Sequence, residues 1–281
     1  MNIKKAVLAS LAALAATGII LGCGGASSSD GSKAASESKP EKTEIVVGVT
    51  PGASDRIMDV VVAEAAKDGL KVTVKTFADY VTPDQALDSG EIDLNSFQHK
   101  PFLDSFNEKN GTKLISIGNT YLAPLGLYSK KYTSVNEIPD GATIAIPNDP
   151  SNGGRALLLL QKQGLIKLKD GIDSTKMTIQ DIVENKKNLK IVELEAAQLP
   201  RSIEDTAASV INAGYAISAG LSSKTDAIAV EDNTSPYINI IAARPEDKDD
   251  PAYKKFVKAF QSDAVKKFIN ENYEGALVPA W

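Results

Sequence analysis

Residues 147–155 (PNDPSNGGR) form a polar turn that leads into an expected helix and contains one arginine, Arg155. A helix N-terminus presents unpaired N–H groups and partial positive charge. The guanidinium of Arg155 adds a planar set of donors that matches a carboxylate. The turn lacks the Gly-Lys-Ser/Thr ending of a phosphate-binding loop. The turn therefore predicts a binding site for a small anion. The alternative is that Arg155 pairs with a surface carboxylate.

A second group of residues offers aromatic rings. Residues 97–102 (FQHKPF) directly follow an expected strand and bring Phe97, Phe102 and the single histidine, His99, within six positions. Tyr80 follows the preceding long strand and is expected to face the same place. Aromatic faces suit an apolar or thioether side chain, because sulfur near a ring gains about 0.3–1.5 kcal/mol. The alternative is that the phenylalanines pack in the core and that His99 is structural.

Two asparagines complete the candidate site. Asn212 follows a short apolar run at residues 209–211, and Asn239 follows residues 235–238. An amide side chain carries both a donor and an acceptor, so it can help to hold an ammonium and a carboxylate together. The alternative for each asparagine is a turn or bulge position.

Alternating strand and helix signals must position these groups. In the first half, strands are expected at 45–49, 72–76, 92–94 and 114–117, with helices that begin near Ser54, Thr82 and Lys100 between them. In the second half we expect strands at 143–146, 189–194, 209–211 and 238–243, a helix at 155–163, and two helices near 253–260 and 264–273. This alternation predicts an α/β protein with a mainly parallel sheet. Two such series with a return strand suggest two lobes, joined by two crossovers, with a ligand cleft between them.

The N-terminal residues have the pattern of an export signal. Lys4 and Lys5 precede an uncharged run of 17 residues, 6–22, which is short for a membrane-spanning helix of about 20 residues. The run ends in Leu21-Gly22-Cys23 and resembles a bacterial lipobox, which implies cleavage after residue 22 and lipidation of Cys23. Residues 24–42 lack large apolar side chains and are expected to form a flexible tether, 23–42 with the cysteine, of about 25 Å reach.

Composition excludes several functions. The chain has 281 residues, a formal charge of −5, one cysteine and one histidine. No concentrated positive run suits nucleic acid. The scarcity of cysteine and histidine argues against a disulfide framework and a thiolate or multi-histidine metal site. We therefore expect a lipid-anchored protein on the extracytoplasmic face of a cell membrane, with no metal, no cofactor and no nucleic-acid partner.

An ordered set of segments closely resembles the methionine-binding lipoproteins of the NlpA family, the substrate-binding components of methionine ABC importers. The resemblance covers residue 44 to the C-terminus, and its segments are NSFQHKPF at 95–102, GNTY at 118–121, YSKK at 128–131, PNDP at 147–150, GRALLLL at 154–160, LPRS at 199–202, VIN at 210–212 and SPYIN at 235–239, followed by Trp281.

The resemblance implies a two-lobed periplasmic binding protein fold of type II that closes over methionine. Lobe I would be residues 43–122 with 240–281, and lobe II residues 123–239. The side-chain pocket for the thioether would be lined by Tyr80, Phe97, His99 and Phe102. Arg155 would bind the α-carboxylate, while Asn212 and Asn239 would hold the polar end of the amino acid. The partners would be methionine, an importer permease with its ATPase, and the membrane through Cys23, with the protein itself a monomer.

Two positions depart from the family pattern, because Phe102 and Ala123 stand where many members have tyrosine. Related ligands therefore stay open: D-methionine, a methionine derivative such as the sulfoxide, or a short methionine peptide. An enzyme that uses His99 as a general base beside Arg155 is not favoured, because no nucleophile motif, metal cluster or paired-carboxylate signature accompanies it. A surface lipoprotein with an adhesive role is the remaining alternative.

Overall fold

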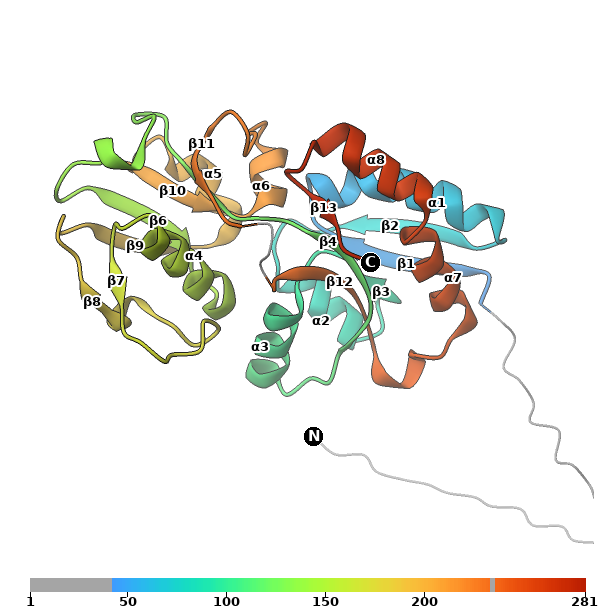
Figure 1. The fold of residues 1–281 in the computed structure, drawn as a ribbon. Coiled ribbons are helices and arrows are strands. Elements are labelled where there is room, and N and C mark those ends of the chain that lie inside the picture. The colour runs from blue at the N-terminus through green and yellow to red at the C-terminus, as the bar shows by residue number, and fades with distance from the viewer. Residues whose placement is uncertain (1–41, 233–235) are drawn as a thin grey trace, which may run out of the picture. The chain divides into compact units, whose positions relative to one another are not determined.

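The computed structural model describes residues 42–232 and 236–281 (Figure 1). The predicted signal peptide at 1–22, the lipidated Cys23 and the tether up to residue 41 lie outside the described residues. Within the described ranges, no helix combines the length and the hydropathy that a membrane span requires.

The first sheet has six strands in the order β13-β4-β12-β3-β1-β2. The strands are β1 (Glu44–Val49), β2 (Lys71–Thr76), β3 (Leu94–Asn95), β4 (Ile115–Leu122), β12 (Ile238–Ala243) and β13 (Val278–Pro279). β1 runs parallel to β2 and β3, whereas β12 runs antiparallel to both β3 and β4. The return strand β12 lies where the sequence predicts it, and it brings Asn239 next to His99, which follows β3.

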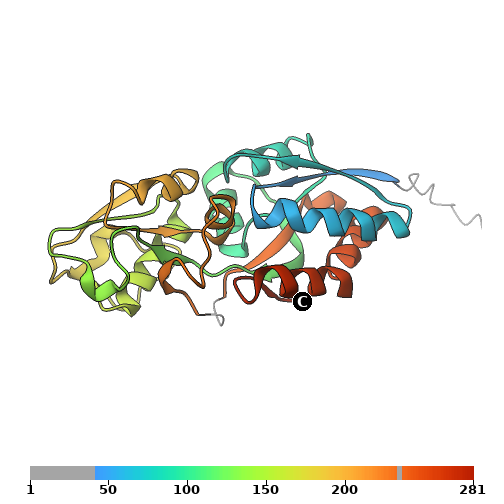
Figure 2. The same cartoon turned by 90° about the horizontal axis from the view of Figure 1, so that it is seen from above.

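The second sheet has five strands in the order β11-β5-β10-β6-β9. The strands are β5 (Gly126–Tyr128), β6 (Thr143–Pro147), β9 (Lys190–Leu194), β10 (Ala208–Ile211) and β11 (Ala227–Val230), and a separate pair consists of β7 (Lys167–Leu168) and β8 (Ile182–Glu184). β6 runs parallel to β9 and β10, and β5 runs antiparallel to β10 and β11. Figures 1 and 2 both show these elements grouped apart from those of the first sheet.

The expectation of a mainly parallel arrangement is wrong, because both sheets are mixed. Helical crossovers between successive strands enforce parallel pairing, and that rule holds for β1, β2 and β3. The chain leaves the first sheet after β4 and returns in β12, and these two strands pair antiparallel to each other. The chain therefore crosses between the sheets twice, first at residues 123–125 and again between the end of β11 and the start of β12. We keep the predicted lobes, 43–122 with 240–281 and 123–239, as a proposal.

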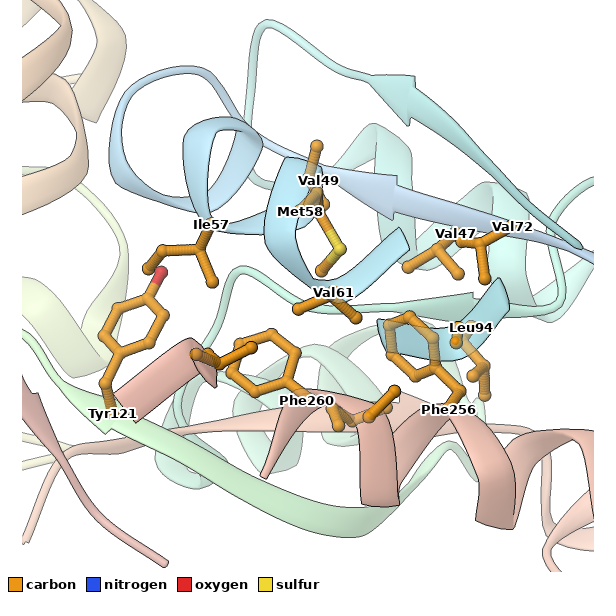
Figure 3. Packing of buried hydrophobic residues seen from close by; sticks show 14 of the residues in the cluster. Val47, Val49, Ile57, Met58, Val61, Val72, Leu94, Tyr121, Phe256 and Phe260 are labelled. Carbon is orange, nitrogen blue, oxygen red and sulfur yellow. The ribbon is translucent and has the colours of Figure 1, made fainter. Parts of the chain in front are cut away.

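Eight helices surround the sheets in the described residues. They are α1 (Ala53–Lys67), α2 (Thr82–Asp88), α3 (Lys100–Asn110), α4 (Pro150–Lys162), α5 (Leu199–Ser202), α6 (Ala213–Ser218), α7 (Pro251–Phe260) and α8 (Asp263–Tyr273). Four short 3₁₀ turns are η1 (Val135–Glu137), η2 (Ile179–Asp181), η3 (Ala196–Gln198) and η4 (Pro245–Asp247). The main core of the first sheet lies among α1, α7 and α8, where Phe256 and Phe260 pack close to Val61 (Figure 3).

One predicted helix start is close and one needs correction. The helix expected to begin near Ser54 begins at Ala53, after Gly52, whose φ of 106° suits glycine. A side chain there would also lie 2.2 Å from the Gly214 carbonyl oxygen. The predicted loop at 147–154 is shorter than expected, since α4 begins at Pro150 with Asp149 as its N-cap. Proline is favoured in the first turn because its missing N–H has no helical partner there. The earlier start places Asn152 inside the helix, on the turn before Arg155.

Candidate functional site

All seven predicted site residues line one cavity between elements of the two sheets. They are Tyr80, Phe97, His99, Phe102, Arg155, Asn212 and Asn239, and they are joined by Thr50, Ala53, Ser54, Gln98, Tyr121, Ala123, Asn152, Ala213, Gly214 and Leu277. The free volume that these residues enclose is about 40 Å³, so the cavity is nearly closed.

One end of the cavity is aromatic. The ring centroid of Tyr80 lies 5.6 Å from that of Phe97 and 5.8 Å from that of Phe102. Phe97 lies between β3 and α3, while Phe102 is in the first turn of α3. Both phenylalanines are buried, but neither belongs to the buried apolar clusters found among the described residues. The two phenylalanine rings therefore form the wall of an apolar recess and do not belong to the main cores, whereas Tyr80 also packs against the cluster around Tyr128 and Leu199.

His99 is the N-cap of α3 and is fully buried. Its Nδ1 accepts a hydrogen bond from the Phe102 backbone N–H at 3.2 Å, so Nε2 carries the proton. Nε2 then donates to Asn152 Oδ1 at 3.0 Å. Burial, assisted by the positive charge of Arg155, lowers the pKa of His99 to about 3. The ring is neutral at physiological pH, and both of its nitrogens are engaged by protein partners.

Asn152, which the sequence analysis did not single out, connects these groups. Its Oδ1 accepts from His99 Nε2 and from Asn212 Nδ2, the latter at 3.1 Å. Its Nδ2 donates to the carboxylate of Asp149 at 3.0 and 3.1 Å. Burial raises the pKa of Asp149. The Asp-Pro pair at 149–150 is the signal that would have located Asn152, because it marks the start of the helix.

Arg155 has 3% of its side-chain surface exposed and is paired inside the protein. Its Nε donates to both oxygens of Glu231 at 2.9 Å, and its Nη2 donates to Glu231 and to the Ala123 carbonyl oxygen. The guanidinium carbon lies 4.5 Å from the centroid of the Tyr237 ring. The alternative that Arg155 pairs with a carboxylate is therefore correct, but the pair is buried and does not lie on the surface. No described residue accepts a hydrogen bond from Nη1.

The two asparagines also face this end of the cavity. Asn212 is the N-cap of α6, and its Nδ2 donates a hydrogen bond to Asn152 Oδ1. Its Oδ1 is buried and has no hydrogen-bond partner among the described residues. An acceptor left unpaired in this way costs about 1–3 kcal/mol, which a ligand donor can offset. Asn239 donates from Nδ2 to the Phe97 carbonyl oxygen at 3.2 Å and forms a β-bridge with His99.

An aromatic pair separates the cavity from a wider groove. Tyr80 and Phe102 line both spaces, and the groove has a volume of about 520 Å³. The Tyr215 ring lies 4.9 Å from the Tyr80 ring, and its hydroxyl donates to the Ala78 carbonyl oxygen at 2.9 Å. Across residues 42–232 and 236–281, no cluster of three histidine, cysteine or acidic residues is arranged to hold a metal ion.

Comparison with known proteins gives consistent results. The family model described as NlpA lipoprotein matches residues 45–281. The D-methionine-binding lipoprotein MetQ of Escherichia coli is 46% identical over 285 residues, with 100% of both chains covered. A nutrient binding protein from Burkholderia cenocepacia, solved bound to methionine, is 52% identical with a TM-score of 0.83, covering 84% of this chain and 100% of its own. A periplasmic substrate-binding protein of an ABC transporter from Coxiella burnetii is 46% identical with a TM-score of 0.81, covering 84% and 100%.

Proposed function

Because the chain belongs to the NlpA lipoprotein family, we propose that its cavity captures methionine and that the protein delivers this ligand to an ABC importer. The observation that supports the proposal is that one cavity has an apolar, aromatic end and a polar end. The aromatic recess at Tyr80, Phe97 and Phe102 adjoins a polar end where Arg155 Nη1 and Asn212 Oδ1 are unpartnered within the described ranges. The methionine-bound relative and the name of the E. coli relative support the same ligand.

The proposed placement of the ligand follows from this polarity. The thioether would lie among Tyr80, Phe97, His99 and Phe102, where sulfur gains from contact with aromatic rings. Arg155 Nη1 would donate to the α-carboxylate, and this charge-assisted bond would be strong because the site is buried. Asn212 Oδ1 would accept from the α-ammonium, with Asn239 beside it. Asn152 would act behind Asn212, because its Oδ1 occupies the Asn212 amide nitrogen and so leaves the amide oxygen for the ligand.

Binding would operate by closure of the cleft. The His99–Asn152 and Tyr215–Ala78 hydrogen bonds join residues 78–99 to residues 152–215, which belong to the two different proposed lobes. A ligand that contacts both sides favours the closed form by the difference between its affinities for the closed and open states. We propose that this closed form docks on the permease, whose ATPase supplies the energy for import.

We further propose that Cys23 is lipidated and that residues 24–42 tether the monomeric body to the extracytoplasmic face of the membrane. The lipoprotein names of the relatives support this location. A catalytic role for His99 has no such support. A general base needs a pKa near the working pH and a free nitrogen, whereas His99 has a pKa of about 3 and donates and accepts through its two nitrogens.

The proposal is tested first by identifying what the purified protein carries. Mass spectrometry of small molecules released on denaturation is expected to find methionine. Calorimetry on the refolded, ligand-stripped protein then compares L-methionine, D-methionine, methionine sulfoxide and a methionine dipeptide, with leucine as an apolar control of similar size. Strong binding of at least one methionine enantiomer, together with weak leucine binding, is expected. If neither enantiomer binds and no sulfur amino acid is released, the proposed function is wrong.

A further inference from the structure

Glu231 is the acidic partner of the buried arginine, and no sequence motif indicated it. It directly follows β11, at the start of the second crossover. Its carboxylate accepts from Arg155 Nε and Nη2 and, at 3.1 Å, from the backbone N–H of Leu125 in the first crossover. The Glu231 backbone N–H in turn donates to the Leu125 carbonyl oxygen at 2.9 Å. One side chain therefore ties Arg155 to both crossovers.

These contacts fix the orientation of the guanidinium. Glu231 and the Ala123 carbonyl oxygen occupy Nε and Nη2, and the Tyr237 ring covers the group at 4.5 Å. Nη1 is the nitrogen left for a ligand within the described residues. A guanidinium held by a bidentate partner cannot turn without breaking both bonds. The orientation of Nη1 is thus set by Glu231 before any ligand arrives.

The same pair also sets the charge of the site. Arg155 is 3% exposed and Glu231 is 15% exposed, so neither charge is strongly screened by water. The positive charge of Arg155 is offset by Glu231, and His99 contributes none because burial holds its pKa at about 3. The other charged group close to Asn152 is Asp149, whose carboxylate is bound by that residue. The polar end of the cavity consequently offers no net positive charge to a ligand.

We propose that Glu231 is a positioning and selectivity residue, which fixes Nη1 of Arg155 for the ligand carboxylate and makes the cavity select net-neutral zwitterionic amino acids over the matching monoanions. This inference rests on the proposed function, since it assumes that Arg155 meets the ligand carboxylate. A zwitterion brings its own ammonium to Asn212 Oδ1. A monoanion of the same shape adds an uncompensated negative charge beside Glu231, and it leaves Asn212 Oδ1 without a cationic donor.

The test compares two probes of equal size on ligand-stripped protein by calorimetry. The probes are methionine and its 2-hydroxy analogue, in which a hydroxyl replaces the α-ammonium. We expect the wild-type protein to bind methionine at least about 100-fold more tightly than the hydroxy acid. In Glu231→Gln this ratio should fall at least about tenfold, because the compensating negative charge is lost and the amide nitrogen repels Nη2. Glu231→Asp retains the charge and should keep a ratio closer to that of the wild type.

Asp232→Asn is the matched control, since it removes the same charge one residue further along. Asp232 is 64% exposed and pairs with the exposed Lys162. Its ratio should stay within about twofold of the wild type, because exposed charges are screened. The inference is overturned if the wild type binds both probes equally, if Gln and Asp at 231 lower the ratio alike, or if Asp232→Asn lowers it as much as Glu231→Gln.

The design also covers two further outcomes. If Glu231→Gln does not fold, the wild-type ratio and the Glu231→Asp ratio still decide the inference. If the wild type binds neither probe, the proposed function fails. If the wild type binds methionine and its ratio is unchanged in a folded Glu231→Gln protein, only the role of Glu231 fails.

Discussion

Replacing Arg155 with alanine should weaken methionine binding and also lower the unfolding free energy. The two effects have different causes and can be measured separately. The proposed contact from Nη1 to the ligand carboxylate is a charge-assisted hydrogen bond in a buried site, and truncating one side of such a pair costs about 2–5 kcal/mol. We take about 3 kcal/mol, which raises the Kd for methionine about 100-fold. The same substitution leaves Glu231 without its guanidinium in a site that is only 15% exposed. Leaving a buried charge unpaired destabilises a fold by about 3–5 kcal/mol, and the partial exposure of Glu231 favours the lower end.

The assay combines calorimetry with urea unfolding on four proteins: the wild type, Arg155→Ala, Glu231→Gln and the double variant. In the double variant the Glu231 carboxylate is also removed, so most of the lost unfolding free energy should return. The affinity should not return, because the donor to the ligand is still missing. The reasoning is refuted if Arg155→Ala binds methionine within about threefold of the wild type, or if the double variant regains both stability and affinity.

Three further outcomes follow from the described contacts. Phe97→Ala should weaken methionine binding about tenfold in calorimetry, because it removes apolar contact and leaves the polar end of the cavity intact. This loss is smaller than that expected for Arg155→Ala. An equal loss of affinity in both variants would contradict the placement of the thioether. Tyr215→Phe removes the hydrogen bond to the Ala78 carbonyl oxygen, which joins the two proposed lobes, and should speed methionine dissociation about fivefold in stopped-flow. An unchanged rate would count against a role of this bond in the closed form. Asp84→Asn should alter the pH dependence of stability: burial raises the Asp84 pKa from 3.8 to about 7, so between those values the folded chain holds a proton that the unfolded chain releases. Rising pH over this window therefore costs the wild-type fold about 1.4 kcal/mol per unit, and the stability of the variant relative to the wild type should rise with pH in urea unfolding at pH 4, 5.5 and 7. A pH-independent difference would show that Asp84 does not hold that proton.

Local patterns predicted the elements that carry the site better than they predicted how those elements pair. The apolar run at 238–243 is β12, and the strand and helix that flank residues 97–102 lie as expected. The mixed sheets were missed, because the direction of a strand that enters from the other sheet depends on the crossover and leaves no periodic signal. The start of α4 was missed because the glycines at 153 and 154 were interpreted as loop, although both lie inside the helix.

The predicted site residues share one cavity because each follows a strand or begins a helix, and such positions collect at the same edges of the sheets. The contacts among these side chains could not be predicted from the sequence. Arg155 and Glu231 are separated by 76 positions, and the residues around Glu231 have no feature that distinguishes a buried acid from an exposed one. The neighbouring Asp232 is exposed and pairs with a surface lysine. Only the three-dimensional structure separates these two acids.

Several groups beside the cavity lower the free energy of unfolding, and this loss is itself evidence of a function. A buried arginine–glutamate pair is often no more stable than apolar side chains of the same volume. The amide oxygen of Asn212, which has no hydrogen-bond partner in the part of the chain that the structure describes, and a histidine held neutral further destabilise the fold. Departures from the ordinary rules of burial are common at functional sites, although in the described residues Asp84, Thr120 and Tyr273 also have buried oxygens without a hydrogen-bond partner outside this cavity. What distinguishes the cavity is that Arg155, His99 and Asn212 line the same space, where one ligand can supply partners to more than one of them.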